Sequence, residues 1–451
     1  MIRNRSTSMR KINQEQGQAI IVIAFAIVAL VGFAALAIDG GRVLADRRHA
    51  QNAADTAAFA AALAKVKGQD FTDAGQVRAA SNDYDNNGTS NIVEVNLCNE
   101  TGITCKLPTG ANPANYIRVK ITSHVHTIFA RVLGISNLTN VVEAVAKATS
   151  PVTSSWFNGK ALVSTMAGCK GDNGDPNNPF TVGGNGTTIV NNSGIFVNSA
   201  CSVAFVDNGN SNLVTTTNGT CVVGGIQSGV NGVTPPPVGH CGTQIDINDY
   251  ILPDPDEYCA TPGSITGSGG NYEAWPGSFN TTGNKTFPDA SPSGVLKLHK
   301  GVYCFYNGIS LNANWEITTD LNGNGSHDSA SEGVFFYVPS GDVTFNGGSS
   351  LNIHAIDSSD YPSSIQKYLF YIPQSNHANV TITGNSGSIY TGTVLAPSSH
   401  CTLDGSGNTF SLDTQLICYD TTITGAGYIN ITYTEANNAI VSTKPTIEME
   451  Q

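Results

Sequence analysis

The chain has 451 residues, of which only 12% are charged, and its formal net charge is −12. So little charge excludes a coiled coil and a charged disordered chain. The acidic balance also argues against a nucleic-acid partner, because phosphate binding needs a basic face. Residues 1–150 hold 15 Lys and Arg against 11 Asp and Glu, whereas residues 151–451 hold 7 against 23. This shift predicts two modules of different composition, with a boundary near Pro151.

An uncharged run of twenty residues, AIIVIAFAIVALVGFAALAI, occupies positions 19–38. As a helix it spans about 30 Å, the thickness of the hydrocarbon core of a bilayer. We therefore predict a transmembrane helix at 19–38, preceded by a basic cytoplasmic segment at 1–18. The alternative is a cleaved signal peptide, because Ala35-Leu36-Ala37 offers a cleavage site, although twenty apolar residues exceed the usual signal core.

Ten cysteines, an even number, all lie after residue 97, and no C-x-x-C motif occurs. The sequence therefore lacks the basic spacing of zinc ribbons and thioredoxin-like sites. We predict disulfides in an oxidising external compartment, with reduced buried thiols as the alternative. This places the N-terminus in the cytoplasm and the bulk of the chain outside the membrane, at the cell surface. Cys98 and Cys105 bracket a short loop and are expected to pair with each other.

The pairing of the other eight disulfide candidates stays open, because eight cysteines allow 105 combinations. These candidates are Cys169, Cys201, Cys221, Cys241, Cys259, Cys304, Cys401 and Cys418.

The stretch from Arg42 to Val66 is rich in alanine and free of Gly and Pro, which predicts a helix. Together with the apolar run, residues 17–64 resemble the N-terminal domain of TadG-like proteins of the bacterial Tad (Flp) pilus-assembly system. The shared pattern is a Gly before the span, Asp39 and Arg42 at its exit, and QNAAD at 51–55.

The resemblance implies a membrane-anchored protein of the pilus machinery, exposed outside the cytoplasmic membrane, with Tad pilus components or pseudopilins as partners. Pilins of this system carry a glutamate near the start of the mature segment, but Val22 stands at that place here. Processing by a prepilin peptidase is therefore not supported.

Residues 39–150 are predicted to form a small α+β module, because strand-like alternation follows the alanine-rich helix. Beyond residue 150, short β-branched and aromatic runs alternate with Gly, Asn and Ser. The motifs VTFNG, VTITG, CTLDG and TTITG begin at positions 343, 380, 401 and 421. A repeat near twenty residues is typical of the rungs of a parallel β-helix.

We therefore predict an all-β, right-handed parallel β-helix over residues 151–435, with a Pro-rich excursion at 232–262 and a tail at 436–451. The alternative is an antiparallel β-sandwich, because the same strand lengths fit that fold.

One segment, DLNGNGSHD, resembles a calcium loop. Oxygen-bearing side chains stand at its positions 1, 3, 5 and 9, and Gly325 stands at position 6, where a loop turns back. The candidate metal ligands are Asp320, Asn322, Asn324 and Asp328. The acid expected at position 12 is replaced by Ser331, with Glu332 one residue further. The segment is either a structural calcium site or an Asx-rich turn, and no other cofactor is expected.

Catalysis is not expected, because no nucleophile elbow, zinc-protease motif or P-loop occurs. The scattered carboxylates Asp342, Asp357, Asp404 and Asp420 carry no distinctive motif. We expect a single-pass structural protein associated with Tad pilus assembly, serving surface display or adhesion, with self-association as a further option. The alternative is a surface carbohydrate-binding or polysaccharide-cleaving β-helix, in which Trp275, Trp315, Tyr361 and Tyr390 stack on glycans.

Overall fold

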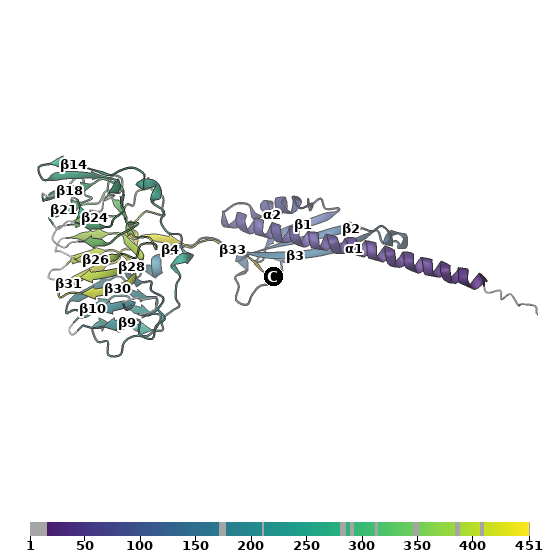
Figure 1. Cartoon of the computed structure of the whole chain (residues 1–451), viewed down its shortest axis with the longest axis horizontal. Coiled ribbons are helices and arrows are strands. Elements are labelled where there is room, and N and C mark those ends of the chain that lie inside the picture. Colours follow the sequence, from purple (N-terminus) through teal and green to yellow (C-terminus); the bar gives the residue numbers. More distant parts are fainter. Residues whose placement is uncertain are drawn as a thin grey trace, which may run out of the picture. The chain divides into compact units, whose positions relative to one another are not determined.

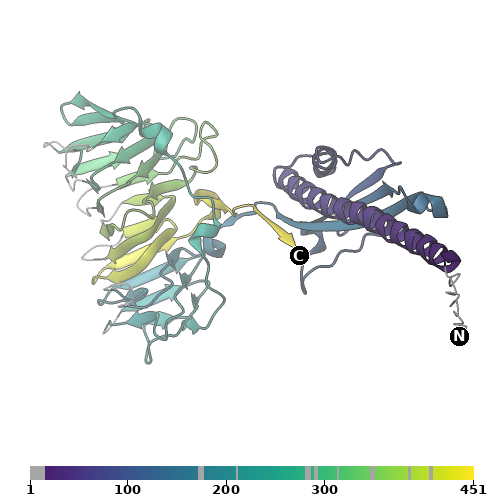
Figure 2. The same cartoon turned by 45° about the vertical axis from the view of Figure 1, so that its right-hand side comes forward.

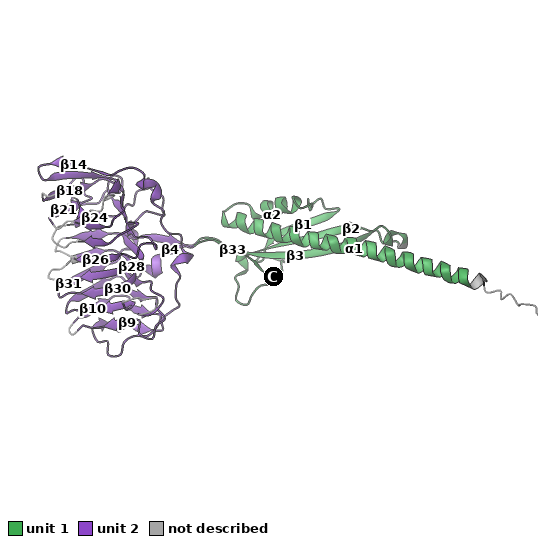
Figure 3. Cartoon of the chain, viewed as in Figure 1, with its two compact units in different colours: residues 1–151, 444–451 green, residues 152–443 purple. Residues whose placement is uncertain are grey.

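The computed structural model describes residues 16–170, 177–209, 212–279, 286–288, 293–311, 314–345, 351–383, 388–405 and 410–450. Most of the predicted cytoplasmic segment, residues 1–15, lies outside them. The chain forms two compact units, coloured separately in Figure 3. Unit 1 comprises Met1–Pro151 and Lys444–Gln451, and unit 2 comprises Val152–Thr443.

Unit 1 begins with one long helix, α1 (Gln16–Val66), which is 51 residues long. It joins the apolar segment and the alanine-rich segment that the sequence predicted as helices. A second helix, α2 (Phe71–Ala80), was not predicted from the sequence. The carboxylate of Asp70 caps it by accepting the N–H groups of Thr72 and Asp73. Its short sequence, FTDAGQVRAA, has no clear apolar stripe and therefore gave little helical signal.

The helices of unit 1 pack on a four-stranded antiparallel sheet, whose strand order is β1-β2-β3-β33. The strands are β1 (Asn91–Leu97), β2 (Tyr116–His126), β3 (Asn137–Thr149) and β33 (Thr446–Glu450). Figures 1 and 2 show α1 running across the strands. Its buried face consists of alanines, which lets the helix axis approach the sheet closely. These alanines are Ala50, Ala53, Ala54, Ala57, Ala58, Ala61 and Ala62.

The last residues of the chain belong to this sheet. β33 pairs with β3, with Ile447 opposite Ala148. The segment 436–451, which we described as a tail, therefore contains two strands, β33 in unit 1 and β32 (Ile440–Ser442) in unit 2, where β32 pairs with β4 (Thr153–Ser155).

Unit 2 consists mostly of short strands in two parallel-rich sheets. In the described residues, the first sheet has eleven strands. In spatial order they are β12 (Val233–Thr234), β10 (Leu213–Thr216), β7 (Thr187–Asn191), β31 (Tyr428–Thr432), β29 (Phe410–Asp413), β27 (Ile389–Thr391), β24 (Leu351–His354), β21 (Trp315–Thr318), β18 (Gly294–Leu298), β15 (Asn271–Trp275) and β14 (Ser264–Ser268).

The second sheet has sixteen strands by the same count. Its main path is β13 (Val238–Gly239), β11 (Thr220–Val222), β8 (Ile195–Val197), β5 (Leu162–Ser164), β30 (Leu416–Thr424), β28 (Thr393–Asp404), β25 (Tyr368–Tyr371), β22 (Val334–Tyr337), β19 (Gly301–Phe305) and β16 (Gly277–Phe279). Beside this path lie β6 (Phe180–Val182), β9 (Phe205–Asp207), β17 (Thr286–Phe287), β20 (Ile309–Leu311), β23 (Val343–Phe345) and β26 (Asn379–Thr383).

Parallel pairing dominates these two sheets, and β14 with β15 is the one antiparallel pair among their described strands. The sequence repeats occupy equivalent positions in neighbouring strands. Val343 pairs with Val380, Val380 with Cys401, and Cys401 with Thr421. An antiparallel sandwich needs the opposite pairing. The interior is lined with apolar and aromatic side chains, for example Phe336 and Phe370, whose ring centroids are 4.7 Å apart.

The order of the strands differs from the order of the chain. β5, β6 and β7 stack in one direction toward β12 and β13, whereas the strands from β14 onward stack from the opposite end until β30 and β31 pair with β5, β6 and β7. The last strands of unit 2 therefore lie against its first strands. The predicted Pro-rich excursion links the two ends of the stack through η5 (Ile247–Asp249) and η6 (Asp256–Cys259).

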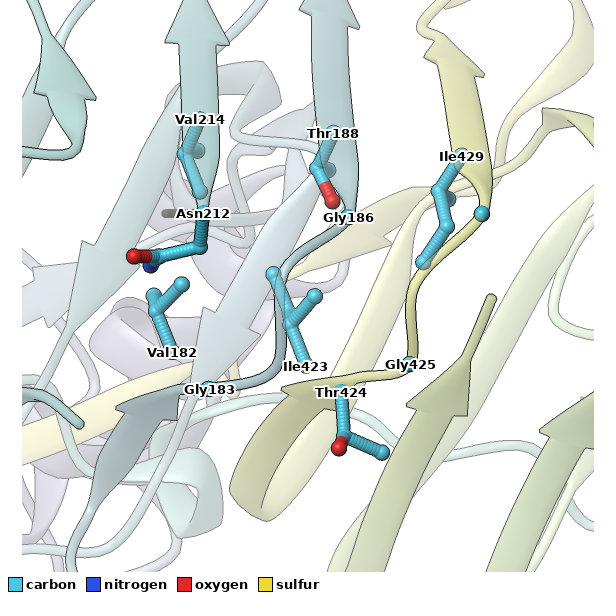
Figure 4. A pocket seen from close by; sticks show the side chains of 11 residues that line it. Val182, Gly183, Gly186, Thr188, Asn212, Val214, Ile423, Thr424, Gly425 and Ile429 are labelled. Atoms are coloured by element: carbon cyan, nitrogen blue, oxygen red, sulfur yellow. The ribbon is translucent and has the colours of Figure 1, made fainter. Parts of the chain in front are cut away.

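Where β30 and β31 meet β6 and β7, glycines allow the backbones to approach each other closely. Figure 4 shows Gly183 and Gly186 beside the end of β30, which carries Ile423 and Thr424 and is followed by Gly425. The N–H of Gly183 donates to the carbonyl of Ile423 at 2.8 Å, and the N–H of Thr187 donates to the carbonyl of Gly427 at 2.9 Å.

Candidate functional site

The first functional feature is the apolar part of α1. It is the one helix in the described residues that is long and apolar enough to cross a membrane, and its apolar window is not buried by other parts of the protein. Ile20, Phe25 and Leu36 are each about 70% exposed. Because exposing so many large apolar side chains to water is unfavourable, this segment fits a lipid environment.

Asp39 lies one residue beyond the predicted span and connects α1 to the loop between β2 and β3. Its carboxylate accepts the backbone N–H groups of Ile128 at 2.9 Å, Phe129 at 3.0 Å and Ala130 at 2.7 Å. These residues lead into η2 (Ala130–Leu133). The sequence marked Asp39 as a family feature, and the structure gives it a role in holding this loop.

Asp46, two helical turns further along α1, contacts β2, β3 and the loop that carries Tyr84. Its carboxylate accepts the amide of Asn140 at 2.7 Å and the hydroxyls of Ser123 and Tyr84. Burial, followed by the nearby Asp46 carboxylate, raises the pKa of Tyr84 well above its ordinary value. The sequence analysis did not single out Asp46, because its partners are far away in the chain.

Gln51 makes a third contact from α1 to the sheet. Its side-chain amide donates to the carbonyl of Glu143 at 3.1 Å and to the carboxylate of Asp55 at 2.8 Å. Polar residues on an otherwise alanine-rich helix therefore fix its orientation on the sheet.

All ten cysteines form disulfides, which confirms the predicted disulfide framework and the Cys98–Cys105 pair. The other bridges are Cys169–Cys201, Cys221–Cys241, Cys259–Cys304 and Cys401–Cys418. Cys241 and Cys259 lie in the Pro-rich excursion, and their partners lie in β11 and β19. The excursion is thus covalently tied to strands near both ends of the stack.

The candidate calcium ligands lie together in one loop, and their side-chain oxygens accept hydrogen bonds from that loop. The Asp320 carboxylate accepts the N–H groups of Gly323, Asn324 and Gly325, the last at 2.7 Å. These bonds, first that of Gly325, lower the pKa of Asp320. Asn322 and Asn324 each accept the N–H group two residues ahead. These contacts form Asx turns, which support the loop without an ion, so calcium binding stays a prediction.

Asp328, the fourth candidate ligand, accepts the N–H of Ala330 and the hydroxyl of Ser331. The neighbouring Glu332 is fully buried. Its two carboxylate oxygens accept the N–H groups of Leu321 at 3.0 Å and Asp328 at 2.8 Å. Glu332 therefore closes the loop from inside. In the described residues, no group of three or more His, Cys, Asp and Glu side chains has metal-binding geometry.

Asp342 and Asp420, two of the scattered carboxylates, occupy equivalent positions along the same sheet. Asn379 pairs with His400 and His400 with Asp420, while the N–H of Asn379 donates to Asp342 at 3.0 Å. Three strand spacings of about 4.8 Å separate Asp342 from Asp420 by about 14 Å. Paired glycosidase carboxylates lie within about 10 Å, so this pair does not fit that arrangement.

The four aromatic candidates for glycan stacking differ in exposure. Trp315 and Tyr390 are each 2% exposed, so the expectation that they stack on sugars is wrong, and they are core residues. Tyr361 is partly buried and packs against Tyr258, with ring centroids 5.5 Å apart. Trp275 is 44% exposed and remains accessible.

Comparisons with known proteins bear on the N-terminal region. Neither a curated protein nor a solved structure matches the chain significantly. Residues 17–64 match the family model Tad, which describes Flp pilus-assembly TadE/G-like proteins. The matched segment contains the exposed apolar helix and the contact residues Asp39, Asp46 and Gln51. The N-terminal region of the chain is therefore TadE/G-like, and with its apolar helix it fits a membrane-anchored protein associated with the Tad pilus system.

Proposed function

We propose that the chain is a single-pass structural protein of Tad (Flp) pilus assembly, with its N-terminus in the cytoplasm and unit 2 displayed outside the membrane. Its role is surface display or adhesion, and not catalysis. The observation that carries the proposal is the TadE/G-like segment, whose apolar half is left uncovered by the rest of the protein.

The cysteines support the external location of unit 2. Four of the five disulfides lie in unit 2, and the fifth closes a loop of unit 1 beyond the predicted span. Disulfides persist in oxidising compartments and are rare in the cytosol.

We also infer that unit 2 is a parallel β-helix. Strands far apart in the sequence pair in parallel across two sheets, and the repeats at 343, 380, 401 and 421 align in register. A stacked coil of this kind provides a rigid body with a large side surface, which suits display outside the cell.

Unit 1 offers a surface for the proposed pilus partners. An open groove of about 510 Å³, lined by α1 side chains that include Phe59 and Leu63, also contains Met449. Phe59 is 47% exposed and Leu63 is 39% exposed. Exposed apolar side chains gathered in one place are typical of protein interaction sites.

The topology is tested on the full chain in its native membranes. Proteinase added to intact spheroplasts should degrade unit 2 and leave a short protected N-terminal fragment. Protection of unit 2 until the membrane is permeabilised would contradict the proposed orientation.

The association is tested by cross-linking and purification from the same membranes. Tad components should be recovered with the chain, and Phe59→Glu should reduce their recovery. Val77→Glu is the matched control, because Val77 is 61% exposed but does not line the groove. Equal recovery with both variants would argue against the groove, and no Tad component with the unaltered chain would overturn the association.

A further inference from the structure

The β14 end of unit 2 presents an aromatic platform beside a polar pocket. β14 is the edge strand of the eleven-stranded sheet, and β15 and then β18 are the next strands inward. Figure 1 labels β14 and β18 at one end of the stack. The register places Ser264 opposite Trp275, Thr266 opposite Glu273, and Glu273 opposite Lys297. Because side chains alternate along a strand, Glu273 and Trp275 share one face while the buried Ala274 points inward.

Trp275 is held flat on this face. Its ring stacks on the imidazole of His299, with centroids 3.6 Å apart and an angle of 10° between the planes. His299 is fixed in turn, because its Nε2 lies 3.0 Å from a carboxylate oxygen of Glu273. An aromatic ring that is held in place and still 44% exposed offers a surface for a flat ligand at little entropic cost.

The pocket beside this platform contains hydrogen-bonding groups. It has a volume of about 310 Å³, and Thr266, Asn271, Glu273 and Lys297 contribute to its lining. The ammonium of Lys297 donates to the carbonyl of Leu321 at 2.7 Å, which fixes its position, and its remaining protons stay available to other acceptors. Glu273 lines the pocket and also contacts the His299 that supports Trp275, so the two features adjoin.

We propose that this surface, formed by Trp275, His299, Glu273 and Lys297, binds a neutral hexopyranose glycan. A sugar ring has an apolar face of C–H groups that packs on an indole, and an edge of hydroxyls that donate to a carboxylate and accept from an ammonium. The pocket volume is at the small end of the usual range for ligand sites, which suits one or two sugar units. The charge balance of residues 151–451, 7 basic against 23 acidic, disfavours an anionic glycan.

This inference deepens the proposed surface role, but its test does not depend on that role. Glycan binding is a property of unit 2 in solution, whereas membrane topology and Tad association are measured separately. Binding together with a cytoplasmic unit 2 would refute the proposed function alone, and an external unit 2 without binding would refute this inference alone.

Tryptophan fluorescence provides a selective readout. The chain has three tryptophans, and Trp156 and Trp315 are 0% and 2% exposed, so acrylamide quenching reports chiefly on Trp275. The full chain is kept in a polyoxyethylene detergent, because a maltoside detergent would compete with the glycan. Neutral gluco-, galacto- and manno-oligosaccharides are then added up to about 10 mM, a concentration that detects the weak end of specific binding.

At least one of these sugars should protect Trp275 from quenching, with saturation. Calorimetry of the same sugar should show loss of binding in Trp275→Ala, weaker binding in Trp275→Phe, and an affinity lower by about tenfold in Glu273→Gln. Tyr306→Ala is the matched control, because Tyr306 is 38% exposed and does not line the pocket, and its affinity should not change. All variants should keep the melting temperature of the unaltered chain.

Three results would overturn the proposal. These are no protection by any neutral sugar, equal affinity in Trp275→Ala and the unaltered chain, and binding of anionic glycans alone.

Discussion

Gly186 lies so close to Gly427 that a Cβ atom on Gly186 would stand 2.6 Å from the carbonyl oxygen of Gly427. The two glycines belong to the first and last parts of unit 2, where β7 pairs with β31. This contact lies where the strands that begin unit 2 meet the strands that end it. A side chain on Gly186 would therefore push β31 away from β7.

We predict that Gly186→Ala destabilises unit 2 by about 1–3 kcal/mol, the usual cost of overpacking. Chemical denaturation of the full chain measures this change. Gly183→Ala is a matched control, because a Cβ there would meet its nearest atom, the carbonyl oxygen of Ile423, at 3.7 Å, an ordinary contact distance. Equal stability of the two variants would show that the junction can open without cost.

The Cys259–Cys304 bridge is expected to stabilise unit 2 more than Cys98–Cys105 stabilises unit 1. It closes a sequence separation of 45 residues, against 7 for the other bridge. In the chain-entropy account a longer closed loop gives a larger gain, about 2–4 kcal/mol for a bridge of this kind. Thermal unfolding of Cys259→Ser/Cys304→Ser and of Cys98→Ser/Cys105→Ser compares them. A larger loss in the second double variant would contradict the expectation.

His354 makes stability depend on pH. Burial, followed by the neighbouring His327, lowers the pKa of His354 to about 4 from 6.5, although Asp357 and Asp320 act in the opposite direction. The rings of His327 and His354 stack with centroids 4.6 Å apart. Above pH 6.5 His354 is neutral in both states, whereas between pH 6.5 and about 4 the unfolded chain binds the extra proton. Stability is therefore lost as pH falls through this window.

The loss attributable to His354 between pH 7 and pH 5 should be about 1–2 kcal/mol. Because carboxylates also titrate at low pH, the informative quantity is the difference between variants. His354→Asn should lose less stability than the unaltered chain over this range. His354→Gln should show the same smaller loss as His354→Asn, because both variants lack the buried imidazole. An identical pH dependence of His354→Asn and the unaltered chain would contradict the prediction.

Local sequence patterns predicted several features of this protein correctly. An apolar run and a stretch free of Gly and Pro predicted the long helix. The spacing of glycine-ended repeats predicted the aligned parallel strands. The even number of cysteines gave the disulfides. The apolar run and the Gly- and Pro-free stretch are local signals, within about 25 neighbouring residues, close to the range over which periodicity is informative. The repeat spacing and the cysteine count are regular over a longer part of the chain, so they too can be recognised without the fold.

Features that depend on distant contacts were missed. Nothing near Asp46 in the sequence indicates Asn140 or Ser123, and nothing near β31 indicates that it pairs with β7. Trp275 and Trp315 are both flanked by polar and small residues, yet one is exposed and the other is buried, because only the stack determines which face of a strand points inward. The Asp320 loop was found from its spacing, but the closing role of Glu332 required the fold.

Calcium binding at the Asp320 loop can be tested directly. If the oxygens of Asp320, Asn322, Asn324 and Asp328 bind calcium, the ion will raise the melting temperature, because it binds the folded state and not the unfolded one. Asp320→Asn should abolish this rise. Asp246→Asn is a suitable control, because Asp246 also caps a short turn in unit 2, through the N–H of Asn248. If the melting temperature is the same in calcium and in chelator, the loop does not bind calcium, and the Asx turns alone account for its conformation.

Replacing Asp39 should loosen the loop after β2 without unfolding unit 1. Its carboxylate accepts three consecutive N–H groups, from Ile128 to Ala130, and alanine leaves all three without that acceptor. Hydrogen exchange of these amides should accelerate in Asp39→Ala, while the amides of β2 that pair with β3 stay protected. Asp73→Ala serves as control, because Asp73 is exposed on α2. Since Asp39 follows the apolar segment directly, unchanged exchange at Ile128–Ala130 would mean that the membrane-proximal end of the sheet is held by other contacts, and the anchoring role given to Asp39 would be wrong.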